Sequence, residues 1–161
     1  TRIRTYLGSL KYTPDEMEHP IRELSGGQKA KVLLLRMSLS GANVLILDEP
    51  TAGLDPKGRD DILNCLKYLR EETGMTIILV SHSMDDVANY VSRIMVMNDG
   101  VLTYDDTPRN VFRHYKELEA IGLAAPQVTY LMNDLKQAGF DVNTDAITID
   151  EAKESILSAL G

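Results

Sequence analysis

Two adjacent carboxylates follow directly on an apolar run. Asp48 and Glu49 come after Val44–Leu47 and are closed off by Pro50. Such a run predicts a strand that is buried on both faces, and the proline ends it because it removes a backbone donor. Parallel sheets bind ligands at the carboxyl ends of their strands. Neighbouring carboxylates repel each other unless a cation or phosphate chemistry needs them, so the pair indicates either such a site or a charged turn after a core strand.

A glycine pair lies at the start of a predicted helix. Ser25 with Gln28 three residues later has the capping-box pattern, which predicts that a helix begins here. Gly26 and Gly27 would weaken its first turn relative to alanine. Glycines at a helix start also let the backbone approach a ligand closely and leave N–H groups pointing at it, which is a phosphate-binding arrangement. The alternative is an ordinary cap that contains glycine.

A histidine follows the next apolar run, Thr76–Val80. Apolar residues at helical spacing predict a helix over about 57–72 between the two runs, so strand, helix and strand form a βαβ unit with parallel strands. His82 then emerges at the same sheet edge as the two acids. We interpret it as a candidate catalytic group, the alternative being a structural histidine.

Other elements are predicted before and after this unit. Thr13, Pro14 and Glu16 indicate a brief helix. A strand is expected over 93–97, and Asn98-Asp99-Gly100 predicts a tight hairpin turn into a second strand. Three amphipathic helices follow, beginning near 108, 126 and 148, and their spacing leaves open whether they pack on the domain or on a partner.

Composition and length limit the class of protein. The 161 residues suit one domain with a small appendage, and there is no apolar stretch of membrane-spanning length. A single cysteine, Cys65, excludes an internal disulfide framework. The net charge of −7 argues against a general nucleic-acid binder. No secretory signal is visible at the start, so we expect a cytoplasmic protein; the first residue is not methionine, so the chain is expected to be a fragment or a processed product.

Taken together, these motifs resemble the C-terminal half of an ATP-binding-cassette (ABC) ATPase domain, which has the P-loop NTPase fold. The resemblance rests on the order and spacing of four motifs: Leu24–Gln28, the strand into Asp48-Glu49-Pro50, the loop Ala52–Asp55, and Ser81-His82. It implies an α/β fold with parallel strands, a terminal β-hairpin and a helical appendage. The implied domains are 1–104, comprising the end of a helical subdomain (1–40) and a core (41–104), and a helical extension (105–161).

The resemblance also implies a role for each motif. Ser25-Gly26-Gly27-Gln28 matches the signature, which contacts the γ-phosphate of ATP held by the opposite subunit of a dimer. Asp48 matches the aspartate that holds Mg²⁺, generally through water, and Glu49 matches the general base. Asp55 matches the aspartate of a loop that crosses the dimer interface. His82 matches the histidine that contacts the γ-phosphate.

The phosphate-cradling loop of this family is missing from the sequence. The nearest approach to its pattern runs from Gly53 to Gly58, but Arg59 and Asp60 follow in place of lysine and a hydroxyl residue. The chain alone is therefore expected neither to hold ATP tightly nor to hydrolyse it. In the family a central strand lies between the strand ending at Val80 and the one at 94–97, so we expect unpaired edges and a marginally stable or associating chain.

The two ends of the chain resemble different branches of the family. Residues 105–161, through Thr107-Pro108, Val111-Phe112 and Ile121–Pro126, resemble energy-coupling factor (ECF) transporter ATPases. Those pair as homo- or heterodimers beneath a membrane coupling protein that drives vitamin or metal-ion uptake, which implies a peripheral position on the inner face of the membrane. Residues 1–51 look more like soluble ABC-F ATPases, which act on ribosomes. A composite chain joined near Asp48–Thr51, and a non-catalytic remnant that only binds partners, are the remaining hypotheses.

Overall fold

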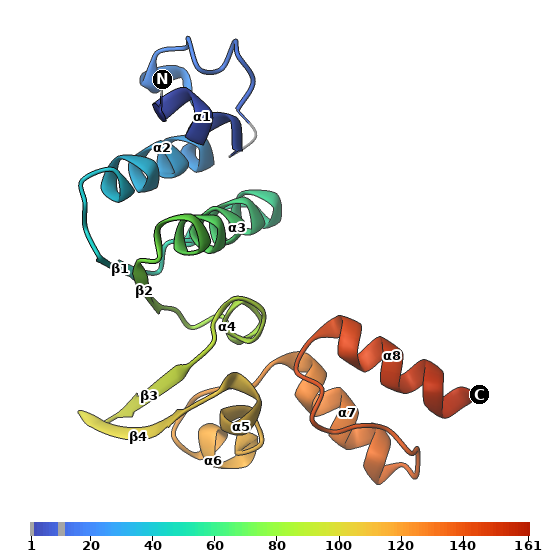
Figure 1. Ribbon diagram of the computed structural model, residues 1–161. Coiled ribbons are helices and arrows are strands. Elements are labelled where there is room, and N and C mark those ends of the chain that lie inside the picture. The colour runs from blue at the N-terminus through green and yellow to red at the C-terminus, as the bar shows by residue number, and fades with distance from the viewer. Residues whose placement is uncertain (1, 10–11) are drawn as a thin grey trace. The chain divides into compact units, whose positions relative to one another are not determined.

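The computed structural model describes residues 2–9 and 12–161, and the described chain divides into two compact units (Figure 1). Unit 1 ends at Ser81 and unit 2 runs from His82 to Gly161. The predicted boundary at residue 104 concerns family domains rather than compactness, and it stays a prediction.

Unit 1 contains the βαβ motif and the helices that precede it. Its elements are α1 (Arg2–Ser9), the short 3₁₀ helix η1 (Ile21–Glu23), α2 (Gly26–Ser38), β1 (Val44–Asp48), α3 (Pro56–Thr73) and β2 (Thr76–Val80). β1 and β2 pair in parallel, from Val44 opposite Thr76 to Asp48 opposite Val80. The structure thus has the predicted strand, helix and parallel strand, with Gly74 closing α3 in the left-handed conformation at φ 68°.

Helices α2 and α3 lie side by side and form most of the core of unit 1 (Figure 1). Their contact faces carry buried aliphatic residues at helical spacing, because three- and four-residue steps return to the same face of a helix. These residues are Leu34 and Leu35 on α2, and Ile62, Leu63, Leu66 and Leu69 on α3. One ion pair crosses the same contact, with Lys31 Nζ 2.8 Å from Asp61 Oδ2. The packing fixes α2, and hence its first turn, relative to α3.

The prediction that the first strand is buried on both faces is wrong for this chain. Leu45 is buried, but Ile46 is 66% exposed and Val44 is 47% exposed. Successive side chains of a strand point to opposite faces, and here only one face of the two-stranded sheet is packed. The apolar run predicted the existence of the strand correctly, but it did not predict that one face of the strand is uncovered.

The brief helix predicted from Thr13 does not form. The capping contacts are present, since Glu16 Oε2 accepts from the Thr13 N–H at 2.8 Å and Thr13 Oγ1 accepts from the Glu16 N–H at 3.3 Å. However, residues 14–18 make only a single turn, and the chain is extended at Pro20 with ψ 138°. A cap pattern specifies the first turn of a helix, but too few residues separate Thr13 from Pro20 for a helix to continue.

Unit 2 contains a hairpin followed by small helices. Its elements are α4 (Met84–Tyr90), β3 (Ile94–Asn98), β4 (Val101–Asp106), α5 (Pro108–Phe112), α6 (Tyr115–Ala120), α7 (Gln127–Gln137) and α8 (Ile149–Leu160). β3 and β4 are antiparallel, and the predicted turn is present with Asp99 at φ 49° and Gly100 at φ 77°. The single helix expected after Thr107 is instead two helices, α5 and α6, because the chain leaves helical geometry at His114, where ψ is 31°.

The C-terminal helices pack within unit 2. Ala125 and Ile147 belong to the same buried cluster as Val111, Phe112 and Leu118. A second cluster joins α7 to α8 through Met132, Val142 and Ala152, among others. At least one side of these amphipathic helices is therefore covered by their own unit. Among the described residues no helix is long and apolar enough to cross a membrane.

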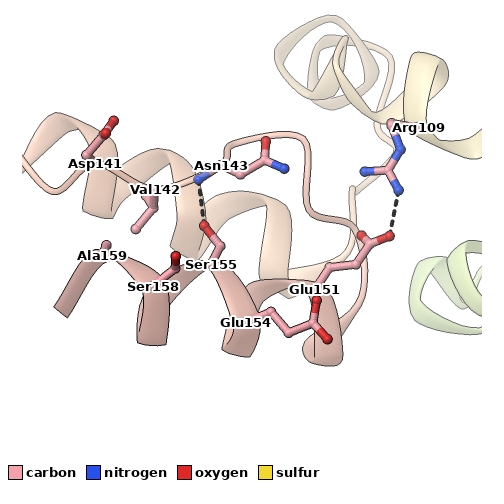
Figure 2. A pocket seen from close by; sticks show the side chains of 9 residues that line it. All are labelled: Arg109, Asp141, Val142, Asn143, Glu151, Glu154, Ser155, Ser158 and Ala159. Carbon is pink, nitrogen blue, oxygen red and sulfur yellow. Dashed lines mark hydrogen bonds and ion pairs between the residues drawn. The ribbon is translucent and has the colours of Figure 1, made fainter. Parts of the chain in front are cut away.

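A polar, open cavity of about 900 Å³ lies between α8 and the segment that precedes it (Figure 2). Figure 2 shows Arg109 reaching Glu151, with 2.5 Å between Nη2 and Oε1. The Asn143 N–H donates to Ser155 Oγ at 2.7 Å. These contacts tie α8 to α5 and to the loop before it.

Candidate functional site

The first turn of α2 has the predicted capping box. Ser25 has extended backbone geometry, with φ −62° and ψ 164°, and its Oγ accepts from the Gln28 N–H at 3.2 Å. Gln28 reciprocates, because its Oε1 accepts from the Ser25 N–H at 2.9 Å. The first intrahelical hydrogen bond runs from the Lys29 N–H to the Ser25 carbonyl at 2.9 Å. The capping box therefore explains the residue types at Ser25 and Gln28, but it does not explain why the two residues between them are glycines.

Gly26 and Gly27 present free backbone donors at this helix start. Within the part of the chain that the structure describes, neither N–H group donates a hydrogen bond. A Cβ at Gly26 would meet no heavy atom within 4 Å, and a Cβ at Gly27 would first meet the Gly58 Cα at 3.9 Å. Neither residue has a positive φ. Neither packing nor backbone conformation in this chain therefore requires glycine here, whereas close approach of an anion to a helix N-terminus would.

The acid pair stands at the carboxyl end of β1, as predicted. Asp48 is the last residue of the strand and is exposed. Glu49 is half-buried and has φ 46°, in the left-handed region that is unfavourable for a residue with a side chain. Its N–H still donates to the Val80 carbonyl at 2.9 Å, so the chain turns sharply while remaining tied to β2. Backbone strain of this kind clusters at functional sites, where surrounding structure maintains it.

Asp55 caps the helix that follows the acid pair. Its Oδ1 accepts from the Gly58 N–H at 3.1 Å. A Cβ on Gly58 would come within 2.7 Å of that same oxygen, so the carboxylate occupies space that any other residue would fill. Because Gly27 lies against Gly58, the first turns of α2 and α3 approach closely. The structure thus brings the first turn of α2, residues Ser25–Gln28 (the signature turn), close to the Asp55 loop in unit 1.

His82 is the first residue of unit 2 and is exposed. It belongs to that unit, whereas the signature turn, the acid pair and Asp55 belong to unit 1. Sequence reasoning missed three residues that support the unit 1 site, namely Tyr12, Glu16 and Gly58. The Thr13–Glu16 cap pattern marks Glu16, but it gives no sign that the turn contacts α2.

Comparison with known proteins identifies relatives across both units. The family described as "ABC transporter" matches residues 1–52. The energy-coupling factor transporter ATP-binding protein EcfA2 of Clostridium tetani is 54% identical over 135 residues, which are 84% of this chain and 47% of that protein. EcfA2 of Acetivibrio thermocellus is 45% identical over 155 residues, which are 96% of this chain and 55% of that protein.

A solved structure shares the fold. It is cbiO1 of Clostridium perfringens, described as part of the ABC transporter complex cbiONQ, with a TM-score of 0.63 and 33% identity over 82% of this chain and 52% of that one. This likeness agrees with the predicted P-loop NTPase fold class. The chain spans about half the length of the curated relatives it matches.

The relatives also bear on the hypothesis that the chain is a composite of two ABC ATPase branches. The Acetivibrio thermocellus alignment leaves out only a few residues, so it crosses the position near Asp48–Thr51 where a junction was hypothesised. An ECF-type protein therefore matches both sides, and the ABC-F alternative is not favoured. The chain is thus similar, over most of its own length, to the ATP-binding proteins of ECF transporters, and its first 52 residues match the ABC transporter family.

Proposed function

We propose that this chain is part of the ATP-hydrolysing subunit of an ECF-type importer, which couples ATP hydrolysis to uptake across a membrane. The observation that carries the proposal is the glycine pair at the start of α2. Gly26 and Gly27 weaken the helix, answer no steric need within unit 1, and leave two N–H donors at the positive end of the helix dipole. This arrangement suits the terminal phosphate of a nucleotide, and the Ser25 hydroxyl lies beside it.

The acid pair supplies the complementary chemistry. Bound Mg²⁺ would contribute the positive charge that neutralises the transferring phosphoryl group of ATP. Asp48 is exposed at the end of β1, and a single carboxylate of this kind suits Mg²⁺, which takes its other ligands from phosphate and water. Glu49 would accept the proton of the attacking water, and the strained turn at φ 46° holds its backbone in place for that role.

The proposal includes partners on two sides. A signature turn on one subunit would complete the nucleotide site of a second ATPase subunit, with Asp55 at the interface and His82 near the γ-phosphate. The relatives named as ECF transporter ATP-binding proteins, and the cbiO1 structure from a transporter complex, support a membrane coupling protein as a further partner. Such a subunit would lie on the inner face of the membrane.

ATP turnover by a full-length subunit that carries these residues tests the proposal. Glu49→Gln is expected to lower kcat on the order of a hundredfold or more, because it removes the general base while ATP binding persists. Turnover near the wild-type level in this variant would show that Glu49 is not the base.

Gly26→Ala provides a second test, in which stability and activity are expected to change in opposite directions. Since a Cβ there meets no neighbour within 4 Å, the variant is expected to stabilise α2 by about 0.5 kcal/mol in urea unfolding followed by circular dichroism. Its kcat is expected to fall, because the added methyl group stands where the phosphate would approach. A variant that is both more stable and fully active would remove the main support for the proposal.

A further inference from the structure

Gln28 is held from one side by two residues of the segment that precedes the signature turn. Tyr12 Oη donates to the Gln28 carbonyl at 2.6 Å. Gln28 Nε2 donates to Glu16 Oε1 at 2.7 Å. Tyr12 therefore contacts the backbone of Gln28, and Glu16, in the single turn that was expected to begin a helix, contacts its side chain.

The contact with Glu16 decides which way the Gln28 amide faces. Its oxygen is used by the Ser25 N–H at 2.9 Å, and its nitrogen is used by Glu16. An amide without the carboxylate is free to rotate by half a turn, which would place its NH₂ group against the Ser25 N–H, donor against donor. The capping box would then lose one of its two hydrogen bonds.

Glu16 is itself fixed as an acceptor. Its Oε2 accepts from the Thr13 N–H at 2.8 Å and from Thr13 Oγ1 at 3.0 Å. The Thr13 backbone N–H, followed by the Thr13 hydroxyl, lowers the pKa of Glu16, so the carboxylate stays ionised. Burial raises the pKa of Tyr12 to about 12, so its hydroxyl stays a neutral donor. Both contacts therefore persist at neutral pH.

We propose that Glu16 is a positioning residue for ATP hydrolysis, which acts through the Gln28 amide to hold Ser25 and the N–H groups of Gly26 and Gly27 in the geometry that receives phosphate. The inference rests on the proposed function of the signature turn. Glu16 does not itself touch the phosphate site. Tyr12 supports the same turn through the Gln28 carbonyl.

The amide contact is measured first, by NMR of the Gln28 side-chain NH₂ group in this chain. Glu16→Ala is expected to shift that resonance and to speed hydrogen exchange at the Ser25 N–H. Asp15→Ala is the matched control, because it removes the neighbouring exposed acid and the same charge. An NH₂ resonance that moves no more in Glu16→Ala than in Asp15→Ala would overturn the inference.

Turnover of a full-length subunit is the second measurement. Glu16→Ala is expected to lower kcat on the order of tenfold with little change in KM, because it loosens a turn that contacts the reacting phosphate. The size of the effect corresponds to the loss of one hydrogen bond to a charged group. Glu16→Gln keeps one acceptor oxygen and is expected to recover part of the loss, and Tyr12→Phe tests the second contact separately.

Two results separate this inference from the proposed function. A wild-type subunit with no turnover would overturn the proposed function, and the positioning role with it. Normal turnover in Glu16→Ala, alongside an altered Gln28 resonance and a deficient Glu49→Gln, would leave the proposed function intact and overturn the positioning role alone.

Discussion

Gly58 shows how a single missing side chain shapes the Asp55 loop. The residue lies in the first turn of α3, where alanine would ordinarily be preferred. Its place is explained by Asp55 Oδ1, which would stand 2.7 Å from a Cβ at this position. The helix cap therefore depends on the glycine, because the Asp55 carboxylate folds back onto α3 into the space that Gly58 leaves open.

A pair of substitutions tests this coupling. Gly58→Ala is expected to destabilise the chain, since the new Cβ displaces the Asp55 carboxylate and forfeits a cap contact of about 1 kcal/mol. In an Asp55→Ala background the same change is expected to be stabilising by up to about 1 kcal/mol, because only the helix propensity of alanine remains. Urea unfolding of the four proteins measures both effects. The same sign in both backgrounds would contradict the coupling.

The C-terminal helix illustrates how an element is held by more than its apolar face. Arg113 reaches Asp145 with Nε to Oδ1 at 2.8 Å and Nη2 to Oδ2 at 2.5 Å, immediately before the segment that leads into α8. Arg109 donates to the Asp145 carbonyl and pairs with Glu151 in the first turn of the helix. Arg109 of α5 and Arg113, the residue that follows this helix, therefore hold the start of α8.

The ion pair between Arg113 and Asp145 predicts that unit 2 loses folding stability at acidic pH. The hydrogen bond from Arg113 lowers the pKa of Asp145 in the folded chain. A lowered pKa means that the stabilisation is present above the unfolded value, about 4, and is lost as the pH falls through the folded value. Wild-type chain is expected to lose more stability than Asp145→Asn between about pH 5 and pH 2 in urea titrations.

Asp134→Asn is the control, as it removes an exposed acid of α7 in the same unit. Its acid sensitivity is expected to match that of the wild type. Parallel pH profiles for the wild type and Asp145→Asn would show that the Arg113 pair contributes nothing measurable, as many exposed ion pairs do.

At the scale of the whole molecule, each unit has a strand pair with one uncovered apolar face. In unit 1, Ile46 and Val80 are 66% and 49% exposed, and in unit 2, Met95 and Met97 are 54% and 59% exposed. Among the described residues β2 pairs only with β1, and β3 only with β4. Each pair of strands therefore has free edges as well as an apolar face, which is the pattern that favours association.

We accordingly expect this chain by itself to self-associate or to be marginally stable. Sedimentation velocity over a range of concentrations measures the association, and Ile46→Lys is expected to reduce it by placing a charge on the exposed face. Lys67→Glu, on the exposed side of α3, serves as a control for altered charge elsewhere. A monodisperse monomer with a cooperative melt well above ambient temperature would contradict this expectation.

Local patterns in the sequence determined the start of α2, the end of α3, the strands of the βαβ unit and the hairpin turn. The Ser25–Gln28 box, the Gly74 cap and the Asp99-Gly100 turn are all confirmed, because each depends on residues within about four positions of one another. The candidate site residues were also identified from sequence, and their proposed roles stay predictions.

Tertiary structure decided what those local patterns do. The Thr13–Glu16 contacts formed as a cap pattern should, yet they hold Gln28 instead of starting a helix, since Tyr12 and Glu16 meet α2 only when the chain folds back. The apolar run at 44–47 specified a strand but could not specify whether its second face is covered. Contacts between distant residues depend on packing, which no four-residue pattern records.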